Sequence, residues 1–425
     1  MSQERPFETE LETAVAHAPA QTLPARARSR AELWAREYGL EALALIWILA
    51  FAFTLRTVNV NWDRNQHLHP DERFLAIVST DIRIPGSVGE YFDSTNSPLN
   101  PYNRSEGATF VYGTFPLFLN KITAEWLDRD ADGSTHQTAD WLFNTLGVFG
   151  VGVDRPDGGR VFDGGYNSNL VGRVLSAIFD TLTVLLVYEL GRFLYGRRAG
   201  LVAAGLLSVT VLHLQYSHFF GSETFAGFFA TAVVYFSARI WKRGDWWDYL
   251  GAGVALGLAI ACKLSVLPVL LVIALAVLMR IGPGLPPLYY RIVNAIDPRG
   301  VNSGEQVPWR GLILPTLGGF GSLLVAGFVF RIFQPYAFAG PGFFDVIDFG
   351  ALARGDILHL THWVKFDDRF VRDIDALRET QTGTDFPPNI QWIGRTPFVF
   401  PLVNMVFWGL GIFLSAAVAL GIGRG

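Results

Sequence analysis

The sequence has a single cysteine, Cys262, among its 425 residues, so it has no internal disulfide bond, and any extracytoplasmic loop must be held by packing and hydrogen bonds. Charged residues are also scarce, at 17% of the chain against roughly 25% in an ordinary soluble domain. There is no basic excess, because 34 Lys and Arg stand against 38 Asp and Glu. These scarcities exclude a disordered chain and a protein that coats nucleic acid, and we expect no nucleic-acid partner.

What the chain has instead is apolar residues, which make up 50% of it and lie in long blocks. A hydrocarbon core about 30 Å thick needs about 20 apolar residues per helix, since each residue rises about 1.5 Å. We therefore predict an all-α polytopic membrane protein with about eight transmembrane helices, of which the fifth is short. The segments that meet or nearly meet the required length are 40–58, 168–190, 199–217, 223–241, 249–262, 264–281, 311–333 and 397–422.

Polar stretches precede and separate these blocks. Residues 1–38 are rich in Glu, Ala, Pro and Arg without apolar periodicity, which predicts a disordered cytoplasmic tail before a membrane domain at 39–425. Within that domain, 59–167 and 334–396 are expected to be extracytoplasmic loops, the first of which carries interfacial helices. No small-residue cleavage site follows the first block, which favours a signal anchor over a cleaved signal peptide.

The positions of Lys and Arg predict the orientation. Basic residues precede the first span and follow the second, fourth, sixth and eighth, so all of them face one compartment if there are eight spans. We expect a multi-pass protein of the cell membrane with a cytoplasmic N-terminus. A ninth span at 110–127 would invert this pattern, so we expect that stretch to lie at the outer interface. The basic residues are Arg26, Arg28, Arg30, Arg36, Arg192, Arg197, Arg198, Arg239, Lys242, Arg243, Arg280, Arg291, Arg299, Arg310 and Arg424.

The first polar motif of interest is the stretch 67–72, soon after the first span. Pro70 suits the first turn of a helix and the acidic pair Asp71 and Glu72 suits its positive end, so helix capping explains the motif structurally. The functional alternative is that one carboxylate removes a proton from an acceptor hydroxyl while the other orients it. The motif's two histidines, among them His69, are only a loose indication of a metal site, so we name no metal ligands and leave a divalent cation open.

The second motif lies at the outer turn between the third and fourth spans and contains His218 and Glu223. An acidic residue that opens a span is a functional candidate, although it is also an ordinary way to begin a helix. Lys263 is its natural partner, because this lysine interrupts an otherwise nearly continuous apolar run. The lysine either snorkels to the interface or binds an anionic headgroup.

The third motif is at the outer end of the seventh span, where Arg331 opposes the inward bias of basic residues. A guanidinium can hold phosphate oxygens in two parallel hydrogen bonds, but a snorkelling arginine in an aromatic belt that includes Tyr336 is an equal alternative. The candidate substrate-binding residues are therefore His69, His218, Glu223, Lys263, Arg331 and Tyr336, and the candidate catalytic residues are Asp71 and Glu72.

These motifs, in this order, resemble the GT-C superfamily of membrane glycosyltransferases, and most of all the protein O-mannosyltransferase and lipid A aminoarabinose transferase group. The likeness covers roughly residues 40–340. It implies that Asp71 activates the acceptor, that Glu72 assists or orients it, and that Lys263 lies near the donor phosphate. The matching pieces are Asp71-Glu72, residues 171–177, residues 195–200, Glu223 with Phe228 and Phe229, and residues 257–265.

The resemblance implies that a sugar, a hexosyl or pentosyl group, passes from a polyprenyl-phosphate-linked donor to a lipid, glycan or protein acceptor on the extracytoplasmic side, with inversion. Members of the group typically continue for several more spans or a soluble domain, so a short variant or one that depends on a partner is also open. The alternatives are a transporter or flippase with a charged substrate site and a non-catalytic membrane scaffold. If the enzyme hypothesis holds, Asp71, Glu223 and Lys263 should converge around an outward-opening cavity.

Overall fold

In the computed structural model, every secondary-structure element of the described residues is a helix, which confirms the expected all-α polytopic fold. The chain divides into two units, Met1–Trp47 and Ile48–Gly425. Helix α2 (Ala25–Thr57) begins inside the stretch that was expected to be a disordered tail. The described residues are 25–127, 164–286, 288–289, 292, 308–340, 365–382, 390 and 393–422.

In these described ranges, five helices are long and apolar enough to cross a membrane, or up to seven if each of two bent pairs is one span. Each of the eight predicted segments corresponds to one of these helices or pairs, or to α11 (Trp246–Cys262), which is short as expected. The five are Tyr38–Thr57 of α2, Tyr166–Tyr195 with α7 (Asn169–Tyr195), α10 (Glu223–Lys242), Leu264–Gly284 with α12 (Leu270–Ile281), and α14 (Trp309–Phe333). In the first bent pair, α8 (Arg197–Ser208) and α9 (Val211–Ser217) meet at 59°. In the second, Val399–Leu410 and Ile412–Gly421 meet at 112°. The second pair contains α19 (Val399–Asn404) and most of α20 (Ile412–Ile422).

The bend between α8 and α9 has a local cause. Thr210 has an extended backbone, with ψ at 119°, so the helical hydrogen-bond ladder stops before it. The last carbonyl groups of α8 would then be left without partners in an apolar setting, which is costly. The backbone N–H groups of Val209 and Thr210 donate to the carbonyls of Leu206 and Leu207, and Arg56 donates to the carbonyl oxygen of Ser208 at 3.0 Å. The bend therefore depends on a buried arginine of α2.

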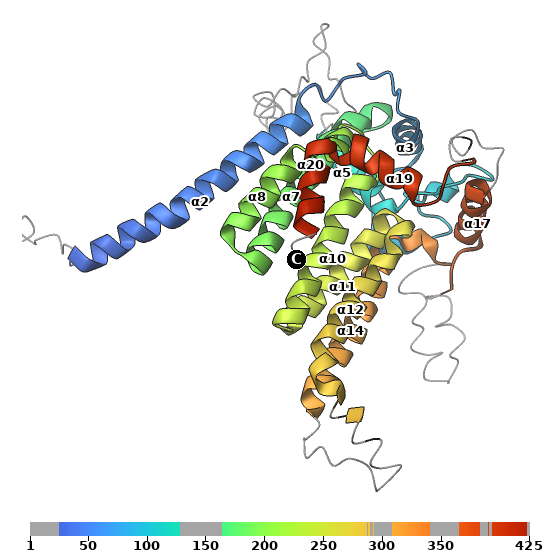
Figure 1. The fold of residues 1–425 in the computed structure, drawn as a ribbon. Helices are drawn as coiled ribbons and strands as arrows, with labels where there is room; N and C mark the ends of the chain where they lie inside the picture. Colours follow the sequence, from blue (N-terminus) through green and yellow to red (C-terminus); the bar gives the residue numbers. More distant parts are fainter. Residues whose placement is uncertain are drawn as a thin grey trace, which may run out of the picture. The chain divides into compact units, whose positions relative to one another are not determined.

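Helices α10, α11, α12 and α14 lie side by side (Figure 1). Two glycines one helical turn apart, Gly253 and Gly257, let α11 approach α14 closely. A Cβ at these positions would lie 2.5 Å from the carbonyl oxygen of Ser322 and 2.6 Å from that of Ala326. Small residues at such spacing favour close helix packing in membranes, where the hydrophobic effect between helices is weak.

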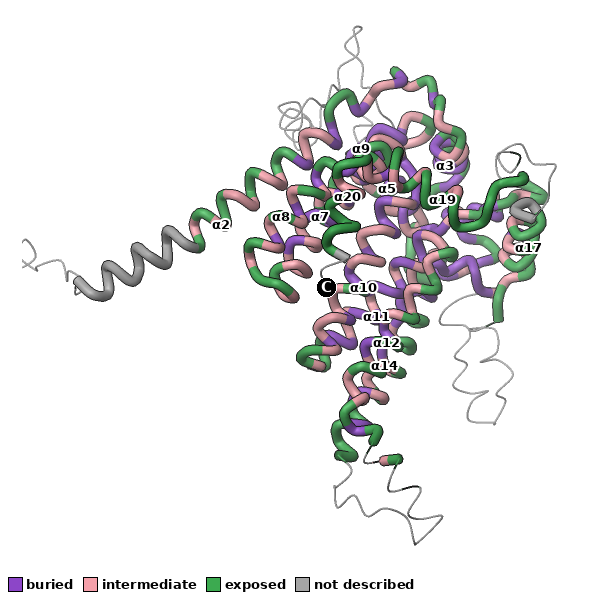
Figure 2. The backbone as a smooth tube through the Cα atoms, in the orientation of Figure 1, coloured by how far each residue is buried: buried purple, intermediate pink, exposed green. Residues whose placement is uncertain are grey.

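The first long loop folds into short helices against the ends of the spans. They are α3 (Pro70–Asp81), α4 (Val88–Phe92) and α5 (Thr114–Leu127). The stretch 110–127, expected not to span, supplies α5, which has 14 residues and is not among the candidate spans. Leu117 and Phe118 of α5 are buried in a core shared with α3 and with Phe220, and buried segments are dense in this region (Figure 2).

The second long loop contributes α17 (Asp368–Thr382), which packs on the first loop. The carboxylate of Asp373 accepts a hydrogen bond from the backbone of Phe110 at 2.7 Å, and the guanidinium of Arg369 donates to the side-chain oxygen of Asn103 at 2.9 Å. The two loops that were expected to share one side of the membrane thus contact each other.

Candidate functional site

A single buried guanidinium anchors the first loop to the bundle. Arg173 of α7 forms a bidentate pair with Glu72, at 2.7 and 2.8 Å, and a second bidentate pair with Asp63, at 2.9 Å for both bonds. All three side chains are fully buried. Both carboxylate oxygens of Glu72 are occupied in this arrangement, so Glu72 fixes α3 in place rather than offering a free base.

The start of α3 fits the capping interpretation of the first motif. Pro70 occupies the first turn, and the side chain of His69 accepts a hydrogen bond from the backbone of Glu72 at 3.4 Å. The imidazole of His69 also stacks on Phe219, with 4.2 Å between ring centroids. His69 is therefore the residue that caps α3. The neighbouring Asp71 is half-buried and lies near a different group.

That group is Tyr112, whose phenol lies close enough to Asp71 for the carboxylate to act on its pKa. Burial raises the pKa of the Tyr112 hydroxyl well above its ordinary value, and the negative charges of Asp71 and Glu223 raise it further. Both carboxylates therefore act on one phenol. The tyrosine stays protonated at neutral pH, near both acidic groups.

The close approach of the loop to α11 explains where Tyr112 lies. The backbone of the next residue, Gly113, donates to the carbonyl of Cys262 at 3.1 Å. A Cβ at Gly113 would lie 2.0 Å from the carbonyl oxygen of Ala261, so any larger residue would push the loop away. This contact places Tyr112 beside the end of α11, where Lys263 follows.

Lys263 and Glu223 form the pair expected from the sequence. The ammonium nitrogen lies 2.7 Å from a carboxylate oxygen of Glu223, and both side chains are partly exposed, at 42% and 28%. Glu223 opens α10, and Lys263 has an extended backbone directly after α11 ends. One group of polar side chains thus forms from the first loop, the start of α10 and the end of α11. Its members are Asp71, Tyr112, Glu223 and Lys263. Their roles in a reaction stay predictions.

A cavity of ≈ 250 Å³ begins at this group. It lies between α7, α9 and α10, and Glu223 is part of its wall. Its other lining residues are Asp180, Leu212, His213, Tyr216, Thr224 and Gly227. The expected convergence of charged side chains beside a cavity is therefore present for Glu223 and Lys263, and Tyr112 links Asp71 to them.

The remaining candidates lie in packed regions. The two ring nitrogens of His218 lie 2.7 Å from the carbonyl of Leu214 and 3.0 Å from that of Val58, which ties α9 to the residue after α2. The hydroxyl of Tyr336 is fully buried and lies 2.7 Å from that of Ser97. Both contacts belong to the framework, and substrate binding by either residue stays a prediction.

Arg331 is also buried, with 2% of its surface exposed. Its guanidinium lies over the rings of Phe338 and Phe92, at 4.9 and 5.6 Å, and donates to the carbonyl of Pro335 at 3.4 Å. Phe338 belongs to the aromatic belt expected from the sequence, but the guanidinium is buried rather than extended to the membrane surface. Binding of a phosphate by Arg331 stays a prediction, and it would require the residue to become accessible.

Sequence reasoning missed Tyr112, Asp63 and Asp180 as members of the site and its support. Arg173 was quoted only as part of a family-like piece. Asp180 and Arg173 carried a usable signal, because an ionisable residue inside an apolar span needs a partner. Tyr112 and Asp63 carried none, since each lies in a polar loop without periodicity.

Among the described residues, no three His, Cys, Asp or Glu side chains gather as ligands for a metal ion. The sequence analysis named no metal ligands either, and the dependence on a divalent cation stays an open expectation.

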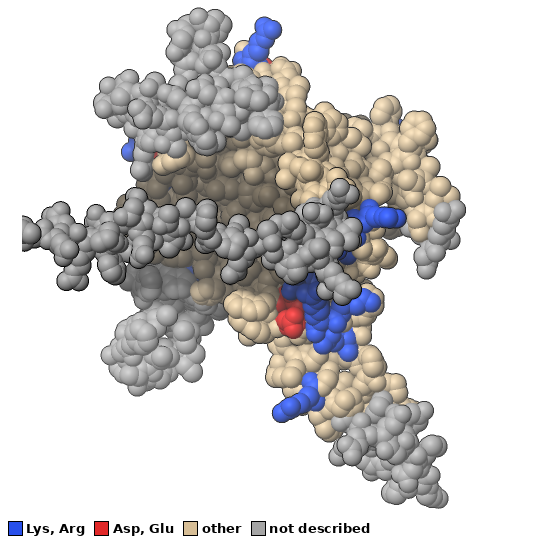
Figure 3. Space-filling model, turned by 90° about the vertical axis from the view of Figure 1, so that its left-hand side faces the viewer, with Lys and Arg blue, Asp and Glu red and all other residues tan. Residues whose placement is uncertain are grey.

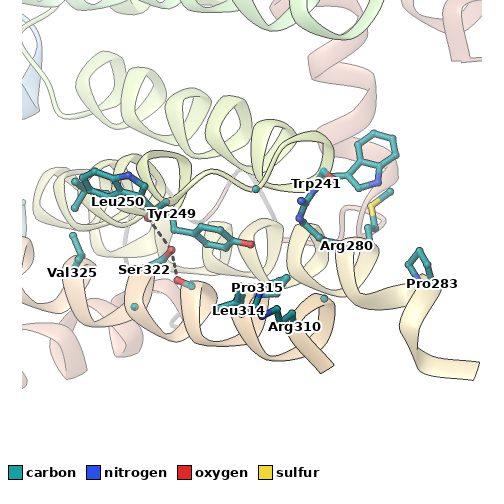
Figure 4. Close-up of a pocket in the computed structure, with 16 residues that line it drawn as sticks. Trp241, Tyr249, Leu250, Arg280, Pro283, Arg310, Leu314, Pro315, Ser322 and Val325 are labelled. Carbon is teal, nitrogen blue, oxygen red and sulfur yellow. Dashed lines mark hydrogen bonds between the residues drawn. The ribbon is translucent and has the colours of Figure 1, made fainter. Parts of the chain in front are cut away.

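A second and larger cavity, of ≈ 770 Å³, lies near the far end of α10, α11, α12 and α14. Figure 4 shows Tyr249 between α11 and α14, with its phenol directed toward Arg280. Arg310 also lines this cavity, and no acidic residue is among its described lining. On the face drawn in Figure 3, basic side chains form a patch with a small acidic area beside it. The described lining of the larger cavity has no carboxylate, unlike the group around Asp71.

Fold and site together define an all-α polytopic membrane protein with a charged site built from loop segments and span ends. Residues 162–284 match the model of a family described as dolichyl-phosphate-mannose-protein mannosyltransferase. This match, which runs from before α7 to the end of α12, confirms the resemblance to GT-C membrane glycosyltransferases. No curated protein matches the chain.

Two solved structures are similar to this chain. One is the archaeal oligosaccharyltransferase AglB from Archaeoglobus fulgidus in complex with an inhibitory peptide and a dolichol-phosphate, at 17% identity and a TM-score of 0.37, with 92% of this chain and 37% of that chain covered. The other is the oligosaccharyltransferase of Archaeoglobus fulgidus in the apo form, at 15% identity and a TM-score of 0.37, with 87% and 39% covered. The chain spans well under half the length of these proteins.

Proposed function

We propose that this protein is a membrane glycosyltransferase that moves a sugar from a polyprenyl-phosphate-linked donor to an acceptor hydroxyl, with inversion. The observation that carries the proposal is the gathering of Asp71, Tyr112, Glu223 and Lys263 beside a cavity between α7, α9 and α10. The family match over residues 162–284 supports the class of donor. The sugar is a hexose or pentose, and the acceptor is a lipid, a glycan or a protein.

Asp71 acts as the general base in this proposal. The acceptor oxygen attacks the anomeric carbon of the donor, its proton passes to the carboxylate of Asp71, and the bond from the carbon to the phosphate oxygen breaks with its electron pair staying on the phosphate. In this proposal the phenol of Tyr112, which lies near Asp71, donates a hydrogen bond to the carboxylate and holds it in position. Glu72 is a positioning residue, because its ion pair with Arg173 fixes the first turn of α3.

Lys263 stabilises the phosphate that leaves. A cation aimed at developing negative charge lowers the barrier most where bulk water is excluded. Glu223, which lines the cavity, holds the ammonium group at 2.7 Å. The pair remains partly exposed, so a ligand headgroup can reach the ammonium without displacing packed side chains.

The test is transfer by the purified, reconstituted protein, with a panel of radiolabelled polyprenyl-phosphate sugars and lipid, glycan and peptide acceptors. Asp71→Asn should lower turnover by about 10²- to 10⁴-fold, because the amide accepts no proton. Asp81→Asn is the matched control, since Asp81 lies at the other end of α3 and is half-exposed, and it should leave turnover unchanged. Full turnover by Asp71→Asn would remove this residue from the mechanism.

A transporter is the second candidate, and one observation favours it. Asp180 lies inside α7, buried with Arg56, which is the kind of intramembrane charge that transporters use. A transporter would move a labelled lipid-linked sugar across vesicles without consuming it. Transfer of the label to an acceptor would identify an enzyme, and movement of the intact donor across the vesicle would identify a transporter. If neither transfer nor transport occurred, the scaffold would be the remaining alternative.

A further inference from the structure

The wall of the cavity beside Glu223 contains a second pair of polar side chains, Asp180 and His213. Asp180 of α7 binds Arg56 and His213 with its two carboxylate oxygens, at 2.7 Å to the guanidinium nitrogen Nε and 2.6 Å to the imidazole nitrogen Nδ1. Asp180 is buried, with 2% of its side chain exposed, whereas His213 is 32% exposed. Asp180 lies roughly 16 Å along the helix axis from Asn169, the first residue of α7, because an α-helix rises about 1.5 Å per residue.

Arg56 neutralises this aspartate and has little capacity for another ligand. Besides its bond to Asp180, its guanidinium donates to three backbone carbonyls, those of Ala52, Ser208 and Leu207. The charge of Asp180 is therefore already balanced by Arg56. His213 is not needed for that balance, so a structural ion pair does not by itself account for the histidine.

Asp180 fixes which nitrogen of His213 carries a proton. An aspartate at 2.6 Å from Nδ1 keeps the N–H on that nitrogen, so Nε2 is the position left for another molecule. Within the described ranges, no residue forms a hydrogen bond with Nε2. His213 lines the cavity, and so does Thr224, whose hydroxyl is buried and has no partner among the described residues. The cavity thus has the partly exposed imidazole of His213 available to a polar ligand, with the buried hydroxyl of Thr224 behind the wall.

The charges around the cavity indicate what that ligand is. Arg56 balances Asp180, and Lys263 balances Glu223, so these four groups sum to zero. Protonated His213 adds one positive charge, which matches the single negative charge of a phosphodiester. A neutral sugar hydroxyl would form only an ordinary hydrogen bond with this imidazole and an apolar chain would form none, whereas a phosphate oxygen gains a charge-assisted hydrogen bond.

We propose that His213, oriented by Asp180, donates a hydrogen bond from Nε2 to the phosphate of the lipid-linked donor and gives that phosphate its proton during transfer. This inference rests on the proposed function and adds a catalytic residue to it. The bond from the sugar to the phosphate oxygen breaks, its electron pair stays on the oxygen, and the proton of Nε2 neutralises one unit of the charge that forms. The acceptor proton goes separately to Asp71.

The first experiment measures binding without turnover. The probe is farnesyl methyl phosphate in detergent, a phosphodiester that carries one negative charge across the working range, so the ligand itself does not titrate. The groups that face His213 are Asp180 from α7, Arg56 from α2, Glu223 with Lys263, and Tyr216 of α9. Carboxylic acids, tyrosines, lysines and arginines ordinarily titrate outside pH 5.5 to 8, so a change within that range reports an imidazole.

Two substitutions separate the two nitrogens of the ring. In His213→Asn the amide nitrogen takes the place of Nδ1, so the contact with Asp180 is kept and the group at Nε2 is lost. In His213→Gln the amide nitrogen takes the place of Nε2, so a neutral donor remains. Wild-type affinity should fall about tenfold from pH 5.5 to 8, which is the loss of one charge-assisted hydrogen bond. His213→Asn should bind about tenfold more weakly at pH 5.5 with no pH dependence, and His213→Gln should lie between.

Gln215→Ala is the control, because Gln215 is an exposed residue of the same short helix, and it should retain the wild-type profile. Thermal unfolding of each variant checks that α9 is intact. Equal binding by His213→Asn and wild type at every pH would overturn the role of His213 and leave the proposed function standing. Absence of probe binding by the wild type would overturn both, and transfer activity that rises with pH through the imidazole range would show a base rather than a proton donor.

Discussion

At the scale of single residues, the site depends on buried pairs between distant parts of the chain. Arg173 is 101 residues from Glu72 and 110 from Asp63, and neither separation leaves a mark in local sequence. Sequence analysis found Asp71, Glu223 and Lys263, because an acidic pair and a lone lysine stand out against apolar surroundings. Tyr112 could not be found, because its importance comes only from the contact of Gly113 with the end of α11.

Removal of the Arg173 guanidinium should be strongly destabilising. Arg173→Met leaves the buried carboxylates of Glu72 and Asp63 without a counter-charge, and breaking such a buried pair costs about 3–5 kcal/mol. Thermal unfolding in detergent measures this. Arg192→Ala is the matched control in the same helix, since Arg192 is 49% exposed and surface pairs contribute about 0–1 kcal/mol. Equal unfolding temperatures for the two variants would contradict the anchoring role of Arg173.

Acid should weaken the same anchor through Asp63. Burial alone would raise the pKa of Asp63, but the hydrogen bonds and charge of Arg173 outweigh it, so this pKa lies below its ordinary value of 3.8. A pKa that is lowered on folding gives stability above the unfolded value that is lost as pH falls through the folded value. The unfolding temperature of the wild type should therefore fall below about pH 4.

Asp63→Asn should unfold at a lower temperature than the wild type at pH 7, and its unfolding temperature should depend less on pH in the acid range. Parallel curves for the two proteins from pH 6 to pH 3 would show that Asp63 does not contribute to the acid sensitivity.

At the scale of helices, composition predicted the apolar segments well but not how they pack. Each of the eight blocks became an apolar helix or a bent pair, because length and hydropathy are local properties. The bend at Thr210 was not predictable, since it is stabilised by Arg56 from another span. The contact of α11 with α14 was equally hidden, although Gly253 and Gly257 have the spacing of a close helix interface.

That interface gives a prediction about helix packing. Gly257→Ala should destabilise the protein by about 1–3 kcal/mol, because its Cβ would lie 2.6 Å from the carbonyl oxygen of Ala326 and 2.7 Å from the Cβ of Val329. Gly327→Ala makes the same chemical change in α14, where a Cβ meets no atom within 4 Å. It should be neutral or stabilise by up to about 1 kcal/mol, since alanine is the better helix former. Thermal unfolding of the two variants should therefore move in different directions.

At the scale of the whole molecule, the arrangement of charges connects topology with function. The group around Asp71 lies at the ends of α10 and α11 that meet the first loop, and the basic patches follow the opposite ends of α7, α10 and α12. The positive-inside rule places those opposite ends in the cytoplasm, so the proposed reaction occurs on the other side of the membrane. This orientation is a proposal, and it fails if α5 spans the membrane.

Single introduced cysteines test the orientation, because the natural Cys262 is fully buried and should react slowly. In a Cys262→Ala background, Glu106→Cys adds a thiol at an exposed position of the first loop, and Tyr195→Cys adds one at the end of α7, where the native side chain is 81% exposed. A membrane-impermeant maleimide should label Glu106→Cys in intact cells and Tyr195→Cys only after permeabilisation. Labelling in the reverse order would invert the topology. Labelling of both positions in intact cells would require an odd number of additional spans, such as α5, between Glu106 and the start of α7.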